Sequence, residues 1–214
     1  YFDWPGAQAD YRKALMLDPN FVPALIQQGD LLATLGHMSE GITTTRKALA
    51  LDPMSVVAWR RLAHFYTHSR QFPAAREAVE RLLQLDPQGD PTSFTAELEL
   101  LAGRPQQALV AREDGVKDFK LQDLAMVEHT LGRSAESQRA LDLLVQRRAN
   151  AMAYQIAEVH AWRGEKDQAF DWLERAYRQR DGGLTYLAYD RFLDSLRSDP
   201  RFRALMTKMK LPLN

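Results

Sequence analysis

Hydrophobic and polar positions follow two nested periods along this chain. Over short stretches the apolar residues recur about every three to four positions, which is the spacing of one face of an α-helix. An Asp-Pro dipeptide closes such a stretch at residues 18–19, 52–53 and 86–87, so the three prolines lie 34 residues apart. A fixed period of this length is typical of solenoids built from helix pairs. The pattern therefore predicts an all-α fold in which one unit of two helices is repeated.

Small residues recur at matching places in both helices of this unit. In the first helix of successive units they are Gly29, Ala63, Ala96, Ala125 and Ala157. In the second helix they are Ala7, Gly41, Ala75, Ala108, Ser137 and Ala169. Two antiparallel helices that approach closely need small side chains where their backbones meet, which explains both series.

The turn between the two helices carries a glycine at matching places in most units, namely Gly36, Gly103, Gly132 and Gly164. Glycine accepts the left-handed conformation that ends many helices. Arg70 occupies the same place in one unit. We therefore expect a neighbouring turn residue to adopt the left-handed conformation there.

The residues of the second complete unit resemble the consensus of the tetratricopeptide repeat (TPR). Its positions for Trp, Leu, Gly/Ala, Tyr, Ala and Pro are matched by Trp59, Leu62, Ala63, Tyr66, Ala75 and Pro87. The resemblance is strong over residues 20–87, clear in the last repeat and weak over residues 88–150, where Glu99 and Glu128 replace the expected Tyr. It implies a right-handed superhelical solenoid of antiparallel helix pairs.

The repeat positions divide the chain into three parts. Residues 1–19 match the second helix of a truncated TPR, residues 20–183 form an array of about five helix pairs, and residues 184–214 form a C-terminal capping segment. In that segment Phe202, Leu205, Met206 and Met209 lie on one helical stripe, which we expect to seal the open end of the array. Because an array does not normally begin with half a helix pair, we also expect more protein upstream.

Both ends of the chain resemble the TPR arrays of certain multidomain bacterial proteins, in which the array follows a winged-helix regulator, a nucleotide cyclase or a kinase. The segments that carry this resemblance are YFDWPGAQADYRKALMLDP at the start and YDRFLDSLRSDPRFRALMTKMKLP near the end. The resemblance implies a partner-sensing arm of a larger regulatory or signalling protein.

Composition argues against several other classes of protein. Lys and Arg total 28 and Asp and Glu total 28, so the chain lacks the basic excess of a nucleic-acid-binding protein, and we expect no direct nucleic-acid contact. The chain has no Cys, hence no thiolate nucleophile or thiolate metal ligand, and neither a G-x-S-x-G nor a P-loop motif occurs. We therefore predict a non-catalytic protein without a cofactor, without a membrane span in this region, and located in the cytoplasm, with the periplasm as the alternative.

The first helix of each TPR unit lines the concave side of the array, and by repeat phase this side is a mixed polar and aromatic groove. The predicted groove residues are Gln27, Asp30, Arg60, His64, His68, Glu97, Met126, His129, Tyr154, Glu158 and Trp162. Such a groove suits a protein or peptide ligand. The carboxylate clamp of chaperone-binding TPR domains is absent, because Ile26 and Asp30 stand at its Lys and Asn positions.

Two alternatives to a peptide-binding scaffold stay open at this point. The array could act mainly in self-association, because the half unit at the N-terminus leaves an apolar face that a second copy would cover, giving a homo-oligomer. A metal-dependent protein is the other alternative, since His64 and His68 stand four residues apart on one helical face. A third ligand would have to come from Glu97 on the neighbouring helix, and we do not expect a metal.

Overall fold

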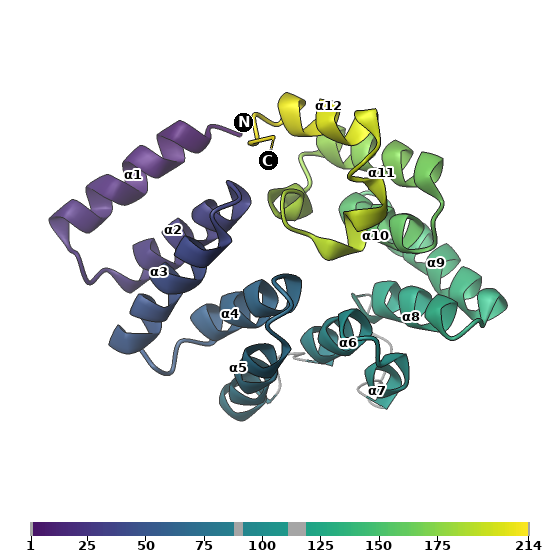
Figure 1. The fold of residues 1–214 in the computed structure, drawn as a ribbon, viewed down its shortest axis with the longest axis horizontal. Coiled ribbons are helices and arrows are strands. Elements are labelled where there is room, and N and C mark those ends of the chain that lie inside the picture. Colours follow the sequence, from purple (N-terminus) through teal and green to yellow (C-terminus); the bar gives the residue numbers. More distant parts are fainter. Residues whose placement is uncertain (1, 88–91, 111–118, 214) are drawn as a thin grey trace.

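The computed structural model describes residues 2–87, 92–110 and 119–213, and these residues form helices and turns without a strand (Figure 1). The α-helices in chain order are α1 (Trp4–Leu17), α2 (Val22–Thr34), α3 (Met38–Leu51), α4 (Val56–His68), α5 (Phe72–Leu85), α6 (Thr92–Leu101), α7 (Pro105–Val110), α8 (Phe119–Thr130), α9 (Ser134–Arg148), α10 (Ala153–Trp162), α11 (Lys166–Gln179) and α12 (Pro200–Lys208). Two 3₁₀ helices, η1 (Gly182–Tyr186) and η2 (Arg191–Leu196), lie between α11 and α12.

The helices pack in consecutive pairs, α2 with α3, α4 with α5, α6 with α7, α8 with α9 and α10 with α11. The pairs follow one another around a curved array, with α1 at one end and α12 at the other (Figure 1). The all-α solenoid of helix pairs that the repeat predicts is confirmed. No helix among the described residues is long and apolar enough to cross a membrane.

Close helix crossings explain the small residues of the repeat. A Cβ atom added to Gly41 would lie 2.8 Å from the carbonyl oxygen of Gly29, so a side chain at residue 41 would collide with the backbone of α2. Ala63 and Ala75 occupy the equivalent places in the next pair, and both are fully buried. At the later crossing of α8 and α9, the Ser137 hydroxyl donates to the carbonyl oxygen of Ala125 at 2.6 Å. The expectation of close crossings at these positions is confirmed.

The turns within the pairs are left-handed, but Arg70 departs from our expectation. The four glycines predicted at this place, Gly36, Gly103, Gly132 and Gly164, have φ values between 75° and 84°. Arg70 itself adopts φ 59°, so no neighbour takes over the left-handed conformation. The prediction for this turn was wrong, because the hydrogen bonds from the Arg70 and Gln71 amides to Thr67 and Tyr66 require the same turn geometry whatever residue occupies position 70.

The residues after α11 first run along the inner side of the array, which is the concave side, and then form α12, which packs on α11. The stripe formed by Phe202, Leu205, Met206 and Met209 is buried in one apolar cluster with Leu173 of α11. Before this stripe, residues 182–197 run along the inner side and reach α4, where the Arg191 amide donates to His68 Nδ1 at 3.0 Å. The C-terminal residues thus contact both α11 and α4, which are far apart in the sequence. The sequence predicted only that these residues cap the end of the array.

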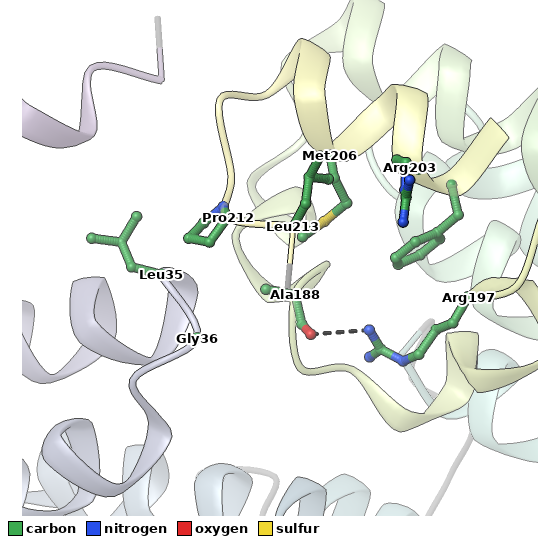
Figure 2. A pocket seen from close by; sticks show the side chains of 9 residues that line it. Leu35, Gly36, Ala188, Arg197, Arg203, Met206, Pro212 and Leu213 are labelled. Atoms are coloured by element: carbon green, nitrogen blue, oxygen red, sulfur yellow. Dashed lines mark hydrogen bonds between the residues drawn. The ribbon is translucent and has the colours of Figure 1, made fainter. Parts of the chain in front are cut away.

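The two ends of the array meet. The Phe2 ring stacks on Tyr177 of α11 with a centroid distance of 5.8 Å, and Trp4 Nε1 donates to the carbonyl oxygen of Met209 at 2.8 Å. Nearby, the turn after α2 faces α12 and the residues that follow it across a pocket of about 150 Å³ (Figure 2). On the far wall of this pocket an Arg197 guanidinium nitrogen donates to the carbonyl oxygen of Ala188 at 3.0 Å.

Candidate functional site

Residues 181–197, which we call the inner segment, cover much of the side of the array that TPR patterning assigned to ligand binding. Two aspartates anchor this segment on α10. Asp181 accepts hydrogen bonds from the Gly183 amide at 2.9 Å and from the Tyr154 amide at 3.1 Å. Asp190 accepts from the Phe192 amide at 2.8 Å and from the Tyr154 hydroxyl at 2.7 Å. Each aspartate therefore caps a 3₁₀ helix and at the same time fixes it to α10.

The Asp190 carboxylate is 1% exposed and lies beside a second buried carboxyl group, that of Glu158. Burial raises the pKa of Glu158 well above its ordinary value, and the charge and hydrogen bond of Asp190 raise it further. Gln122 of α8 donates to Glu158 Oε2 at 2.9 Å. The shift favours the protonated form of Glu158, whose hydroxyl can donate to the Asp190 carboxylate.

His64 and His68 of α4 both face Glu97 of α6. His64 Nε2 lies 3.6 Å from Glu97 Oε1, and His68 Nε2 is hydrogen-bonded to the same oxygen. Burial disfavours the charged form of His68, but Glu97 and then Asp190 outweigh that effect and raise its pKa. Burial lowers the pKa of His64 to about 4, so this ring is neutral at pH 7.

The same three side chains are the candidate metal ligands, and within the described part of the chain their ligand atoms lie within 4.8 Å of one another. The Arg191 amide donates to His68 Nδ1, so the proton of the neutral ring is on Nε2, facing Glu97. The charged ring also carries a proton there. In neither state does His68 Nε2 offer a metal the lone pair that ligation requires. The geometry therefore favours a hydrogen-bonded network in which Glu97 is the shared acceptor.

A second set of contacts holds η1 and the residues after it against α2 and α4. Arg61 Nε lies 2.7 Å from Asp30 Oδ2, and an Arg61 Nη donates to the Tyr186 hydroxyl at 3.3 Å. Burial raises the pKa of Asp30 to about 6, although Arg61 opposes this effect. The Tyr189 hydroxyl lies 3.4 Å from His64 Nδ1. Aromatic and charged side chains thus bind the inner segment to the first helices of the array.

The part of the inner side that the inner segment leaves uncovered is a pocket of about 400 Å³, which we call the inner pocket. It is bounded by α4, α6, α8, α10 and the inner segment. Its lining comprises Arg60, Arg61, His64, Phe94, Glu97, Gln122, Asp123, Gln155, Glu158, Tyr186 and Phe192. A pocket of this size, with a few convergent polar groups and several shifted pKa values, has the properties of a ligand site.

A smaller pocket of about 220 Å³ lies between α1, α2, α4 and η1. Two of the predicted groove residues, Gln27 and Asp30, line it. Trp4 and Tyr11 of α1 form another part of its wall. The N-terminal end of the predicted groove is therefore separated from the inner pocket by Arg61 and Tyr186, which border both.

The predicted groove residues fall into groups with different surroundings. Arg60, His64, Glu97 and Glu158 line the inner pocket. His68, Met126 and Tyr154 are buried at 3% exposure or less and face no open groove, because the inner segment or neighbouring helices cover them. Trp162 is half-buried, and its Nε1 donates to the Thr130 hydroxyl at 2.9 Å. His129 is also half-buried, and burial together with the Arg163 charge lowers its pKa.

The sequence analysis did not predict the residues of the inner pocket that lie at other positions than those the repeat assigns to the concave side. Gln122, Asp123 and Gln155 belong to the first helices α8 and α10, in which the repeat phase assigned other positions, among them Met126 and Tyr154, to the groove. Tyr186 and Phe192 belong to the inner segment, whose only signal was an apolar stretch without TPR spacing. An apolar stretch that lacks the repeat spacing indicates a segment that is buried but does not form a further helix pair.

No protein-family model and no curated protein sequence matches this chain. Among solved structures it is similar to a tetratricopeptide repeat protein from Parabacteroides merdae, with 16% identity, a TM-score of 0.53, and coverage of 97% of this chain and 86% of that one. It is also similar to YrrB, described as a TPR protein with an unusual peptide-binding site, with 17% identity, a TM-score of 0.46, and coverage of 82% and 95%. At such identities the likeness to the first protein concerns the fold and not the ligand.

Proposed function

We propose that this chain, whose repeat pattern resembles the tetratricopeptide repeat and whose fold is similar to that of a tetratricopeptide repeat protein, is a non-catalytic scaffold that binds a segment of a partner protein in the inner pocket. The inner pocket supports this proposal because it remains open between four successive first helices. Rigid helices form its walls, so a bound segment would meet a preformed surface and lose little affinity to ordering of the site.

The chain's own inner segment illustrates the kind of ligand that this side of the array holds. It is bound through the aromatic rings of Tyr186 and Tyr189 and through Arg191, whose Nε donates to the carbonyl oxygen of His68 at 3.0 Å. These are polypeptide contacts of the type found in protein–peptide interfaces. A partner segment would extend the same mode of binding into the adjoining pocket.

Selection from a displayed library of random peptides tests this proposal. The wild-type domain should enrich a family of related sequences, and Gln155→Trp should abolish that enrichment, because the indole would fill the inner pocket. Gln106→Trp, at an exposed position on α7, is the matched control and should enrich the same family. Failure of the wild-type domain to enrich any family, or equal enrichment by Gln155→Trp, would contradict the proposal.

We also propose that the domain is a partner-sensing arm of a larger bacterial regulatory or signalling protein. The support is the resemblance of both chain ends to the TPR arrays of such proteins. The complete coding sequence tests it directly. A DNA-binding, cyclase or kinase domain in the same polypeptide is expected, and an open reading frame that adds only a signal peptide and one helix would contradict it.

Self-association is a second candidate function, favoured by a group of exposed apolar side chains. Leu17 and Leu51 occupy equivalent repeat positions and are 80% and 45% exposed, and Met16 and Met54 beside them are 75% and 64% exposed. All lie at the turns α1–α2 and α3–α4 or the helix ends next to them. Sedimentation velocity over a hundredfold range of concentration tests this candidate. A dimer that Leu17→Lys dissociates would support it, and a monomer throughout would exclude it.

A further inference from the structure

We propose that the pocket where the two ends of the array meet binds a small monocarboxylic acid whose apolar part is about as large as a phenyl ring. We call this pocket the end pocket. Among the described residues, none lines both the end pocket and the inner pocket. The inference is therefore independent of the proposed binding of a partner segment.

The end pocket lies between two parts of the chain that are far apart in the sequence. The turn after α2 forms one wall, and α12 with the residues that flank it forms the other (Figure 2). Leu35 of the turn also packs against the apolar cluster of α11 and α12, so the two walls are in contact beside the pocket. The apolar part of the lining consists of Leu35, Phe202, Met206, Pro212 and Leu213.

The volume of the end pocket, about 150 Å³, limits the size of the apolar part of a ligand. A cavity of about 150 Å³ with aliphatic and aromatic walls is large enough to hold benzene. Removal of such a ring from water against these side chains is favourable. A phenyl ring or a branched alkyl group of about six carbons therefore fits, whereas a longer chain would extend into the solvent.

The charged residues of the lining are both positive. They are Arg197 and Arg203, and none of the described residues in the lining is acidic. Arg203 is exposed, and within the described part of the chain its guanidinium has no hydrogen bond and no ion pair. This guanidinium is thus available to an anion that enters the pocket.

Arg197 is a fixed part of the wall, and its charge is only partly balanced. Its three guanidinium nitrogens donate to Asp194 Oδ1 at 2.8 Å and to the carbonyl oxygens of Ala188 at 3.0 Å and Asp190 at 2.8 Å. Asp194 does not line the end pocket, and its Oδ2 also lies 3.4 Å from Arg191 Nη1. One carboxylate therefore faces two guanidinium groups, and this side of the pocket stays positive.

Apolar walls beside an available guanidinium select a carboxylate that is attached to an apolar group. A guanidinium can bind a carboxylate through two parallel hydrogen bonds. Inorganic phosphate has no apolar part and would leave the walls unfilled, and an amine would meet two positive charges. Because such a ligand contacts both the turn after α2 and α12, its binding would also stabilise the contact between the two ends of the array.

Isothermal titration with 3-phenylpropanoate tests the inference. The wild-type protein should bind this probe with a Kd on the order of 1 mM, as expected for a ligand with about eleven non-hydrogen atoms. The neutral 3-phenylpropanamide has the same shape and should bind about fivefold more weakly. A tenfold excess of inorganic phosphate should not displace the acid. Absence of binding, equal binding of acid and amide, or displacement by phosphate would overturn the inference.

Arg203→Gln and Arg178→Gln form a matched pair, because each removes one positive charge from an exposed position on a helix. Arg203→Gln should lower the affinity for the acid about fivefold and abolish the preference for the acid over the amide. Arg178 does not line the end pocket, so its variant should bind both probes as the wild type does. A preference for the acid that persists in Arg203→Gln would contradict the role of this guanidinium.

Backbone amide chemical shifts locate the bound acid. Titration should shift the amides of Leu35 and Gly36 on one wall and of Leu213 on the other. Ala188→Leu, which narrows the end pocket, should abolish binding, and far-ultraviolet circular dichroism verifies that its helices are intact. Shifts confined to residues of the inner pocket, such as Gln155, would overturn the inference.

The C-terminal residue of a polypeptide carries the same two groups, and Nα-acetyl-phenylalanine represents it. The free acid should bind at least as tightly as this probe, because the end pocket is filled by the phenyl ring alone. Binding of Nα-acetyl-phenylalanine more than tenfold tighter would assign the pocket to a peptide terminus and refute the proposed ligand. The peptide selection is a separate test, since binding of 3-phenylpropanoate without enrichment of any peptide family would keep the end pocket and refute the scaffold function.

Discussion

The Tyr154 hydroxyl donates a hydrogen bond to Asp190 Oδ2 at 2.7 Å, and both residues are almost completely buried. This bond joins α10, the first helix of the last helix pair, to a residue that lies eleven positions after the end of that pair at Gln179. Asp190 is also the N-cap of η2, so the bond connects the fold of the inner segment to its position on the array.

Removing the Tyr154 hydroxyl should therefore destabilise the packing of the inner segment on α10. Tyr154→Phe is expected to lower the free energy of unfolding by about 2 kcal/mol, because the Asp190 carboxylate loses one of its donors in a buried place. Chemical denaturation measures this value. A double-mutant cycle with Asp190→Asn should give a coupling energy of the same order, and a coupling near zero would show that the bond contributes little.

Gly183 is required by the close approach of the inner segment to α10. A Cβ atom at residue 183 would lie 2.6 Å from a ring carbon of Tyr154, a distance that real Cβ contacts do not allow. Gly183→Ala should displace the inner segment and raise amide hydrogen exchange across η1 and η2. Gly182→Ala is the matched control, since nothing lies within 4 Å of its added Cβ, and its exchange pattern should match the wild type.

Arg70 offers a stabilising substitution. Its φ of 59° costs a residue with a side chain about 1 kcal/mol or more relative to glycine, while its guanidinium contacts Asp194 only at 3.9 Å on the surface. Arg70→Gly should raise the free energy of unfolding by up to about 1 kcal/mol. A midpoint of thermal unfolding equal to or below that of the wild type would contradict the strain argument.

The half-buried His64 should make the free energy of unfolding fall at acidic pH. Its pKa is about 4 in the folded protein and near 6.5 in the unfolded chain, so between these values the unfolded state binds more protons and the free energy of unfolding decreases as pH falls. The neighbouring groups that share this site are His68, Glu97, Asp190 and Arg61. The raised pKa of His68 acts in the opposite direction, so the test must isolate His64.

His64→Gln provides that test. Relative to the wild type, the variant should gain about 2 kcal/mol in the free energy of unfolding when pH is lowered from 6.5 to 5, because glutamine has no proton to take up on unfolding. Urea denaturation at several pH values measures the difference. A difference that does not change with pH would mean that His64 titrates as in the unfolded chain.

Arg60 stands at the edge of the inner pocket and is exposed, with only a 3.7 Å contact to Asp86. Arg60→Glu should weaken capture of the selected peptides about fivefold or more if an acidic group of the ligand pairs with this guanidinium at the rim. Helicity should stay unchanged, because the side chain supports no buried contact. Unchanged capture of the peptides would show that the edge of the pocket formed by α4 does not contact the ligand.

In the middle of the array, ion pairs stabilise helices whose sequence departs from the TPR consensus. Glu99 and Glu128 stand where TPRs usually carry Tyr, and both are buried. Arg104 and Arg76 pair with Glu99, and Arg133 pairs with Glu128 at 3.1 Å. Both helix pairs concerned, α6 with α7 and α8 with α9, form despite the substitutions, since a buried carboxylate is tolerated when a guanidinium accompanies it. Sequence pattern could not predict these pairs, because the partners come from other helices or from the following turn.

The sequence by itself determined the helix pairs, their crossings and the end of the array. A 34-residue period, small residues such as Gly29 and Gly41, and the apolar stripe of α12 are local signals, since each depends only on the spacing of residues along a helix. Only the tertiary structure decided what fills the inner side. The contacts of Asp190 with Tyr154 and of Arg191 with His68 join residues 36 and 123 positions apart, in a segment without a repeat register. Spacing along the chain carries no information about such contacts, because they arise from how the curved array closes around its own C-terminal residues.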